Sequence, residues 1–260
     1  MSPWKVVAAS VRGSSHELSG GPCQDAHAFL SREDWLIAVV CDGAGTARNG
    51  DHGARHAAET LVKFIGERVD TSGDIQDDEL RAVVESGIEY ARETVLASLN
   101  VPIATLSDCH ATVVGCVATA KGLLFFHIGD GAAIGLKGTE LASAGISAPE
   151  NGEFANTTYF YTQDFWREHL RFTAFTEPVD LVVLMSDGAM GFCMSKGCTD
   201  AERRFLSPVT RYLADPAVDA KTGSEALMAT LSSTGAASVS DDDKTLVWAF
   251  RSTSTGQAET

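Results

Sequence analysis

The stretch Val39-Val40-Cys41-Asp42-Gly43 indicates fold and chemistry together, because an apolar β-forming run ends in an aspartate followed by glycine. The pattern recurs in Phe126-His127-Ile128-Gly129-Asp130-Gly131 and in Val183-Leu184-Met185-Ser186-Asp187-Gly188. A fourth acidic group, Asp241-Asp242-Asp243-Lys244-Thr245, stands ahead of the apolar run Leu246-Val247-Trp248. A buried strand that ends in a carboxylate holds this oxygen ligand at the rim of a sheet, and Mg²⁺ or Mn²⁺ prefers such hard ligands. The sequence therefore predicts a divalent-metal site assembled by most of the chain.

Length and charge narrow the function classes. The 260 residues accommodate one large domain, and we expect a single domain over 1–260 with its core at about 5–251 and a frayed tail beyond it. The net charge of −15 argues against a general affinity for nucleic acid, because no basic stripe is present to release phosphate counterions. No apolar run approaches the roughly 18 residues of a membrane span, and the N-terminus lacks a signal-peptide core. We therefore expect a cytoplasmic protein without a membrane partner.

The six cysteines favour a reducing compartment. They lie at positions 23, 41, 109, 116, 193 and 198, with no CxxC pair. Cys41 and Cys116 fall inside apolar β runs and are predicted to be core residues. A zinc site formed by Cys193 and Cys198 is a minor alternative.

The order of the predicted elements indicates an α+β layered fold. Apolar β runs cover 4–11, 26–30, 35–41, 111–119, 123–129, 132–136, 170–176, 181–185 and 245–251. Helical periodicity covers 51–69 and 78–99, and two further helices are expected within 201–231. The stretch 145–168 is polar, aromatic and irregular, and is predicted to be a flap. Because the helices are segregated from hairpin-linked strands, we expect two antiparallel sheets flanked by helix pairs.

Five motifs, in order, resemble those of the bacterial branch of the PP2C-type (PPM) metal-dependent protein phosphatases. Each motif alone is weak, since an Asp-Gly after a strand is common in hairpin turns. Their order and spacing match the family over about residues 5–251. The five motifs are Gly21-Pro22-Cys23-Gln24-Asp25-Ala26, Val40-Cys41-Asp42-Gly43-Ala44-Gly45, Gly129-Asp130-Gly131, Met185-Ser186-Asp187-Gly188 and Asp242-Asp243-Lys244-Thr245.

The resemblance implies an αββα sandwich that holds two Mn²⁺ or Mg²⁺ ions at the sheet ends. Asp42 would bridge both ions, and the Gly43 carbonyl would bind the second. Asp187 and Asp242 would bind the first ion, Asp25 would assist the second, and Asp130 would contribute to a third, weaker ion. Asp242 rather than Asp243 takes the ligand position if Thr245 holds the family's Ser/Thr position, in which case Asp243 replaces the usual asparagine.

The implied reaction is hydrolysis of phosphoserine or phosphothreonine in a protein. Two divalent ions about 4 Å apart can share a water, lower its pKa and neutralise phosphoryl oxygens. In relatives an arginine near the N-terminal strand contacts the phosphate; here Arg12, with its bidentate fork, or His16 would serve. The expected partners are a phosphorylated protein substrate and a cognate Ser/Thr kinase or its target.

Two departures from the family pattern keep other functions open. Ala44 stands where many relatives carry a histidine that protonates the leaving oxygen, so the general acid is absent, supplied by His16, or replaced by metal-bound water. Gly131 replaces the serine of Gly-Asp-Ser. Ala44 sustains the alternative of a catalytically weak, phosphatase-like sensor or binding module for a phosphoprotein; a small-molecule phosphohydrolase is a third possibility.

Other features have simpler interpretations beside the functional ones. His52 and His56 have the i,i+4 spacing of a zinc pair, but the glutamate of HExxH is missing. His127 is expected to be a hydrogen-bonded strand residue rather than a catalyst. The aromatic residues of 159–166 either contact the substrate or pack the flap onto the body.

Overall fold

The computed structural model describes residues 3–32, 35–69, 77–99, 101, 104–138, 140–150 and 158–251. Residues 151–157 of the predicted flap and the tail at 252–260 lie outside the described residues. Among the described helices, none is both long enough and apolar enough to cross a bilayer.

Two antiparallel sheets of five strands form the centre of the molecule. The first has the order β1-β10-β9-β6-β7, with β1 Lys5–Val11, β10 Lys244–Phe250, β9 Leu181–Met185, β6 Ala132–Lys137 and β7 Ala142–Ser147. The second has the order β2-β3-β4-β5-β8, with β2 Asp25–Ser31, β3 Leu36–Asp42, β4 Val113–Ala118, β5 Leu123–Ile128 and β8 Arg171–Phe175.

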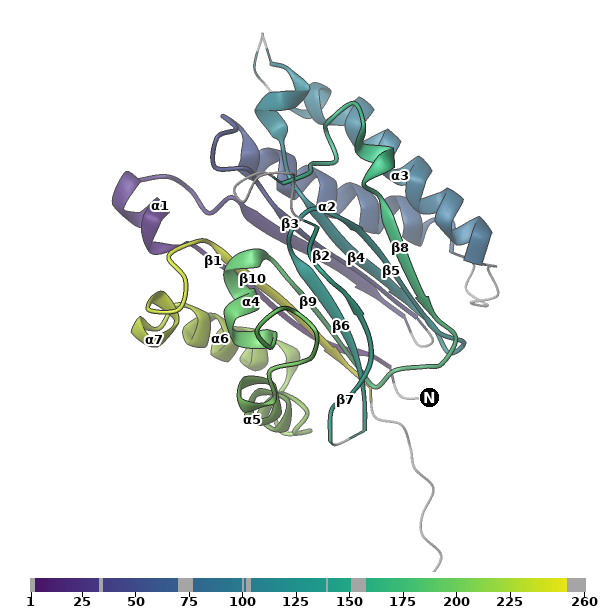
Figure 1. The fold of residues 1–260 in the computed structure, drawn as a ribbon, viewed down its shortest axis with the longest axis vertical. Coiled ribbons are helices and arrows are strands. Elements are labelled where there is room, and N and C mark those ends of the chain that lie inside the picture. Colours follow the sequence, from purple (N-terminus) through teal and green to yellow (C-terminus); the bar gives the residue numbers. More distant parts are fainter. Residues whose placement is uncertain are drawn as a thin grey trace, which may run out of the picture.

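Helices cover the outer faces of both sheets (Figure 1). The pair α2 Gly50–Gly66 and α3 Asp77–Ser98 packs on the β2–β8 sheet, and α5 Arg203–Leu213 with α6 Ala220–Leu231 packs on the other. The short helices are α1 Ser14–Ser19, α4 Asp187–Cys193 and α7 Thr234–Ala237, with 3-10 turns η1 Leu106–Cys109 and η2 Trp166–Glu168. The predicted α+β sandwich is confirmed.

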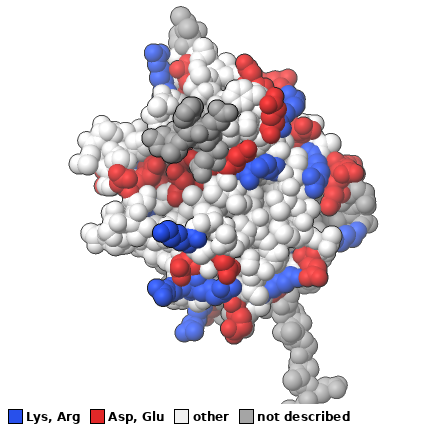
Figure 2. Space-filling view, in the orientation of Figure 1, with Lys and Arg blue, Asp and Glu red and all other residues white. Residues whose placement is uncertain are grey.

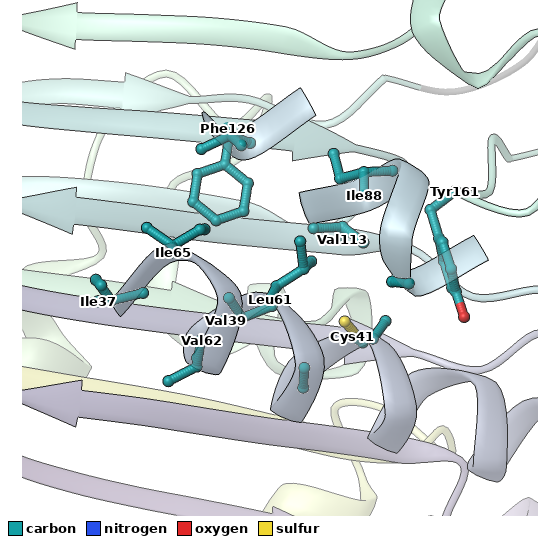
Figure 3. Close-up of a cluster of buried hydrophobic side chains, with 14 of the residues drawn as sticks. Ile37, Val39, Cys41, Leu61, Val62, Ile65, Ile88, Val113, Phe126 and Tyr161 are labelled. Carbon is teal, nitrogen blue, oxygen red and sulfur yellow. The ribbon is translucent and has the colours of Figure 1, made fainter. Parts of the chain in front are cut away.

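Three hydrophobic cores explain why the central strands are continuously apolar. In β3, Ile37, Val39 and Cys41 face α2 and α3, and the intervening residues face the other sheet. Figure 3 shows this helix-side core, with Leu61 and Ile65 of α2 over the strand side chains. A strand covered on both faces carries apolar residues at every position instead of alternating ones.

The structure adds elements that the sequence analysis did not predict. Strand β7 lies partly within the stretch expected to be irregular, and α1 lies between the β runs expected at 4–11 and 26–30. Helix α4 begins at Asp187, directly after β9, where no helix was expected. With 6 and 7 residues, α1 and α4 are too short for a clear helical periodicity.

Candidate metal and phosphate site

Strand register brings the predicted acidic residues to one edge of the sandwich. Asp25 and Asp42 are Cα partners in the β2–β3 ladder. In the other sheet Met185 pairs with both Leu246 and Ala132. The residues that follow β9, precede β10 and precede β6 are therefore neighbours, and these are Asp187, Asp242 and Asp130.

The site's electrostatics show that these carboxyl groups interact. Burial raises the pKa of Asp25 to about 7, with the charges of Asp243 and Asp187 adding to the effect. Burial raises the pKa of Asp187 to about 6, with the charges of Asp242 and Asp130 adding to the effect. The pKa of Asp42 is raised well above its ordinary value by burial and then by Asp25 and Asp187. Without a cation, this cluster cannot carry its full negative charge at low cost.

The free oxygens of the cluster fit a hard cation. The buried Oδ1 atoms of Asp25, Asp130 and Asp187 have no hydrogen-bond partner, and leaving a buried acceptor unpaired is costly. A divalent cation would satisfy these oxygens and offset their repulsion. Within the described part of the chain, no three His, Cys, Asp or Glu side chains already enclose one point. The individual ligand assignments therefore remain predictions.

Asp242 and Asp243 have different surroundings, although they are neighbours in sequence. Asp243 is 2% exposed. Its Oδ1 accepts a hydrogen bond from the Gly13 N–H, and its Oδ2 accepts one from the Gln24 N–H, both at 2.6 Å. Asp242 is half-buried, and its Oδ1 accepts the Asp243 N–H at 2.8 Å. Because backbone donors occupy the oxygens of Asp243, Asp242 is the better candidate for a ligand.

Two glycines allow the close contacts on which this edge depends. A Cβ on Gly188 would lie 2.0 Å from the Asp243 carbonyl oxygen. A Cβ on Gly43 would lie 2.4 Å from the backbone of Gly50. The backbone of Gly43 donates to the Gln24 carbonyl at 3.1 Å, so the turn after β3 is tied to the segment before β2.

The predicted phosphate-binding residues lie beside the Asp241–Asp243 loop. His16, on α1, places its Nδ1 2.9 Å from Asp243 Oδ2. The Ser15 N–H donates to the Asp241 carbonyl at 3.0 Å, which holds α1 against this loop. Arg12 is exposed, and its Nη1 donates to the Gly21 carbonyl at 3.2 Å.

Comparison with known proteins identifies the family to which the chain belongs. A family model described as protein phosphatase 2C matches residues 12–232. The chain belongs to the protein phosphatase 2C family. The predicted PP2C-type serine/threonine phosphatase class is confirmed at the level of this family.

Curated and solved relatives extend the comparison to nearly the whole chain. Serine/threonine-protein phosphatase 3 of Escherichia coli (strain K12) is 28% identical over 253 residues, which are 95% of this chain and 98% of that protein. The Mycobacterium tuberculosis serine/threonine phosphatase PstP/Ppp is 16% identical, with 96% of this chain and 100% of that chain covered and a TM-score of 0.61. The catalytic domain of PstP in complex with two manganese ions is 17% identical, with 95% and 98% covered and a TM-score of 0.59.

A hydrogen-bond network behind Asp25 was not predicted from the sequence. Ser186 Oγ donates to Asp25 Oδ2 at 2.7 Å and accepts the Thr245 N–H at 2.9 Å. Thr245 Oγ1 donates to Ser10 Oγ at 2.6 Å, and Ser10 Oγ lies 2.8 Å from His27 Nδ1. The network links both sheets of this PP2C fold. The serine and threonine inside the acidic motifs were its only local signal.

The histidines of α2 and β5 take structural roles, as do the two cysteines predicted to be core residues. His52 and His56 stack on α2 and bond to Ser98 and Thr94 of α3. His127 is fully buried, with its Nδ1 2.9 Å from Ser147 Oγ. All six cysteines are free thiols, and those at 41 and 116 are core residues as predicted.

The aromatic segment is packed onto the body where it can be described. Tyr161 and Trp166 are 0% and 1% exposed and belong to the core around α2 and α3. The Tyr161 hydroxyl donates to the Gly53 carbonyl at 3.2 Å. Phe165 is 45% exposed. For Tyr161 and Trp166, the packing interpretation is the right one.

Proposed function

We propose that this protein hydrolyses phosphoserine and phosphothreonine in proteins with two Mn²⁺ or Mg²⁺ ions. The observation that carries the proposal is the meeting of buried carboxylates from both sheets, three of which keep an oxygen without a hydrogen-bond partner. The names of the E. coli and mycobacterial relatives support the serine/threonine substrate class. The manganese-bound PstP domain supports the use of divalent metal.

The residues would divide between binding metal and binding phosphate. Asp187 and Asp242 would hold the first ion, and Asp25 and the Gly43 carbonyl would hold the second. Asp42 would bind both ions. Asp130 would contribute to a third, weaker ion. When bound, the metals supply a water of lowered pKa and positive charge for the phosphoryl oxygens. Arg12 would grip the phosphate with its guanidinium. Ser186 holds Asp25 in place through a 2.7 Å hydrogen bond.

A phosphorylated protein is the proposed partner, either a cognate Ser/Thr kinase or its target. Figure 2 shows acidic and basic side chains interspersed on the visible face, without a continuous basic surface.

The free thiols of all six cysteines suit the cytoplasmic location that we propose.

The deciding experiment measures hydrolysis of p-nitrophenyl phosphate and of a phosphothreonine peptide with Mn²⁺, with Mg²⁺ and with EDTA. Turnover that requires metal and is abolished by EDTA would support the enzyme. Metal binding by calorimetry without turnover would favour the phosphoprotein sensor, which Ala44 keeps as the second candidate. Sugar phosphates and nucleotides, tested in parallel, distinguish a small-molecule phosphohydrolase.

A further inference from the structure

We propose that Asp243 orients His16, and that His16 donates the proton to the leaving oxygen of the phosphoester. This inference rests on the proposed phosphatase function. It assigns His16 as a catalytic residue and Asp243 as a positioning residue.

Backbone hydrogen bonds hold the carboxylate of Asp243 in place independently of the His16 imidazole. It is 2% exposed, and the N–H groups of Gly13 and Gln24 each donate to one of its oxygens at 2.6 Å. These two donors come from segments on either side of α1, so they fix the plane of the carboxylate. His16 Nδ1 lies 2.9 Å from Oδ2 of this group, within ion-pair distance but not in the geometry of a hydrogen bond.

A fixed carboxylate at Nδ1 determines what the other ring nitrogen can do. The carboxylate favours a proton on Nδ1, so any second proton resides on Nε2. Nε2 of His16 has no hydrogen-bond partner within the described residues, and 21% of the side chain is exposed. The ring packs beside Gly21, where an added Cβ would lie 3.4 Å from Cδ2. The imidazole is thus held on one side and open on the other.

His16 lies at the rim of the acidic cluster. A Cβ on Gly13 would lie 2.2 Å from the Asp242 backbone, so the segment before α1 is packed tightly on the Asp241–Asp243 loop. Arg12 follows the last residue of β1 and donates to the Gly21 carbonyl, and Cys23 lies just before Asp25, the first residue of β2. Glu17 lies on α1 itself, and Asp243 is on the loop before β10. His16 therefore lies beside the loop that carries Asp242, and Arg12 directly precedes Gly13, which packs on the same loop.

The step balances as an ordinary phosphoester hydrolysis. The bond between phosphorus and the serine or threonine oxygen breaks, and a bond from phosphorus to a water oxygen forms. The proton on His16 Nε2 moves to the departing alkoxide oxygen, which leaves as a neutral alcohol. The attacking water gives up a proton, which restores the imidazolium in the next cycle.

The test compares a poor and a good leaving group in His16→Asn. The asparagine amide can replace Nδ1 as the partner of Asp243, but nothing replaces Nε2. We expect the ratio of kcat/KM on a phosphoserine peptide to that on p-nitrophenyl phosphate to fall by about 10²-fold, because nitrophenolate leaves without a proton. Glu17→Gln, a matched change at an exposed position of α1, should leave this ratio unchanged.

A double-mutant cycle with Asp243→Asn tests the positioning role, with circular dichroism and thermal unfolding to confirm that each variant folds. Asp243→Asn should lower the same ratio, and the double variant should be no worse than His16→Asn alone. Added imidazole should restore the ratio in His16→Ala, a second variant that does not depend on the asparagine contact.

The outcomes separate this inference from the proposed function. If wild-type protein with Mn²⁺ turns over neither substrate, the proposed function fails. The other contradictory outcome is an active wild-type protein for which His16→Asn lowers kcat/KM equally on both substrates, or for which the effects of the two substitutions are additive. In either case the roles given to His16 and Asp243 are wrong and the phosphatase assignment stands.

Discussion

At the scale of single residues, the burial of neighbouring carboxyl groups suits the cluster to a cation. The same burial destabilises the folded protein when no cation is bound. Asp25, Asp42 and Asp187 are buried beside one another, and burial and mutual repulsion raise the pKa of each. Protein groups arranged this way are commonly functional, because folding alone would avoid the repulsion.

Asp42→Asn separates the catalytic role proposed for this carboxylate from its effect on stability. We expect metal-dependent turnover to fall on the order of 10²-fold or more, since even supporting residues around a metal site cost 10–100-fold. In EDTA the unfolding temperature should stay the same or rise, because one of the repelling charges is gone. Turnover assays with Mn²⁺ and calorimetry in EDTA check both parts. Unchanged turnover would remove the two-metal proposal.

The neighbouring aspartates of the β10 loop are distinguished by substitution to alanine. Asp242→Ala and Asp187→Ala should both weaken Mn²⁺ binding in a calorimetric titration. Asp243→Ala should weaken Mn²⁺ binding much less but lower the free energy of unfolding, because two buried backbone donors lose their acceptor. If Asp243→Ala instead abolishes Mn²⁺ binding in a folded protein, Asp243 is the ligand.

At the scale of elements, α4 is placed by a close contact rather than by its own helical propensity. It runs for 7 residues from Asp187, and its second residue, Gly188, packs against the backbone of Asp243. The position of α4 therefore determines how Asp187 and Asp242 lie relative to each other.

Gly188→Ala tests this contact. The added Cβ would lie 2.0 Å from a carbonyl oxygen, so we expect a loss of about 1–3 kcal/mol in the free energy of unfolding and weaker Mn²⁺ binding. Gly235→Ala in α7 is the control, because its Cβ would meet nothing nearer than Ser233 Oγ at 3.8 Å. Equal stability of the two variants in urea denaturation would contradict the role given to this contact.

In the segment around η2, the exposed ring of Phe165 is followed directly by the buried side chain of Trp166. Trp166→Ala should cost about 3–5 kcal/mol of unfolding free energy, since Trp166 is 1% exposed in the core under α3. Phe165→Ala should change stability by less than about 0.5 kcal/mol, because Phe165 is 45% exposed. Chemical denaturation measures both. A large loss in Phe165→Ala would show that the exposed ring also stabilises the fold.

At the scale of the whole molecule, metal and protons compete for a site that both sheets build. The folded-state pKa values of Asp25 and Asp187, about 7 and about 6, lie above the ordinary value of 3.8. Between pH 3.8 and about 6 to 7, these two carboxyl groups keep protons in the metal-free folded protein that they have lost in the unfolded chain. The contribution of these groups to stability is therefore complete below pH 3.8 and is lost as the pH rises through about 6 to 7.

We accordingly expect the unfolding temperature in EDTA to fall between pH 5 and pH 8. Mn²⁺ should raise the unfolding temperature more at pH 8 than at pH 5. At 100-fold excess over Kd, one bound ion adds about 2.7 kcal/mol to the free energy of unfolding. Asp42→Asn should show a smaller rise with Mn²⁺. Scanning calorimetry at both pH values gives the result, and an EDTA curve that rises toward pH 8 would refute the assignment of these shifts.

Much of the architecture could be predicted because its causes are local in the sequence. The continuous apolar runs of β3 and β9 indicate strands covered on both faces, and the periodicity at 51–69 and 78–99 indicates helices. Their alternating faces are seen in the three cores. Strand β7 and helices α1 and α4 were missed, because they are short and are held by contacts with distant segments.

The sequence by itself determined the layered fold, the family and the set of aspartates from which a metal site can be built. Only the tertiary structure decided which oxygens are already bonded: both oxygens of Asp243 accept from the backbone of Gly13 and Gln24, whereas Asp242 accepts only the Asp243 N–H at one oxygen within the described residues. The physical reason is that apolar periodicity and motif order are properties of neighbouring residues. A carboxylate's role depends instead on which donors and charges the strand register brings beside it, across more than 200 residues of chain.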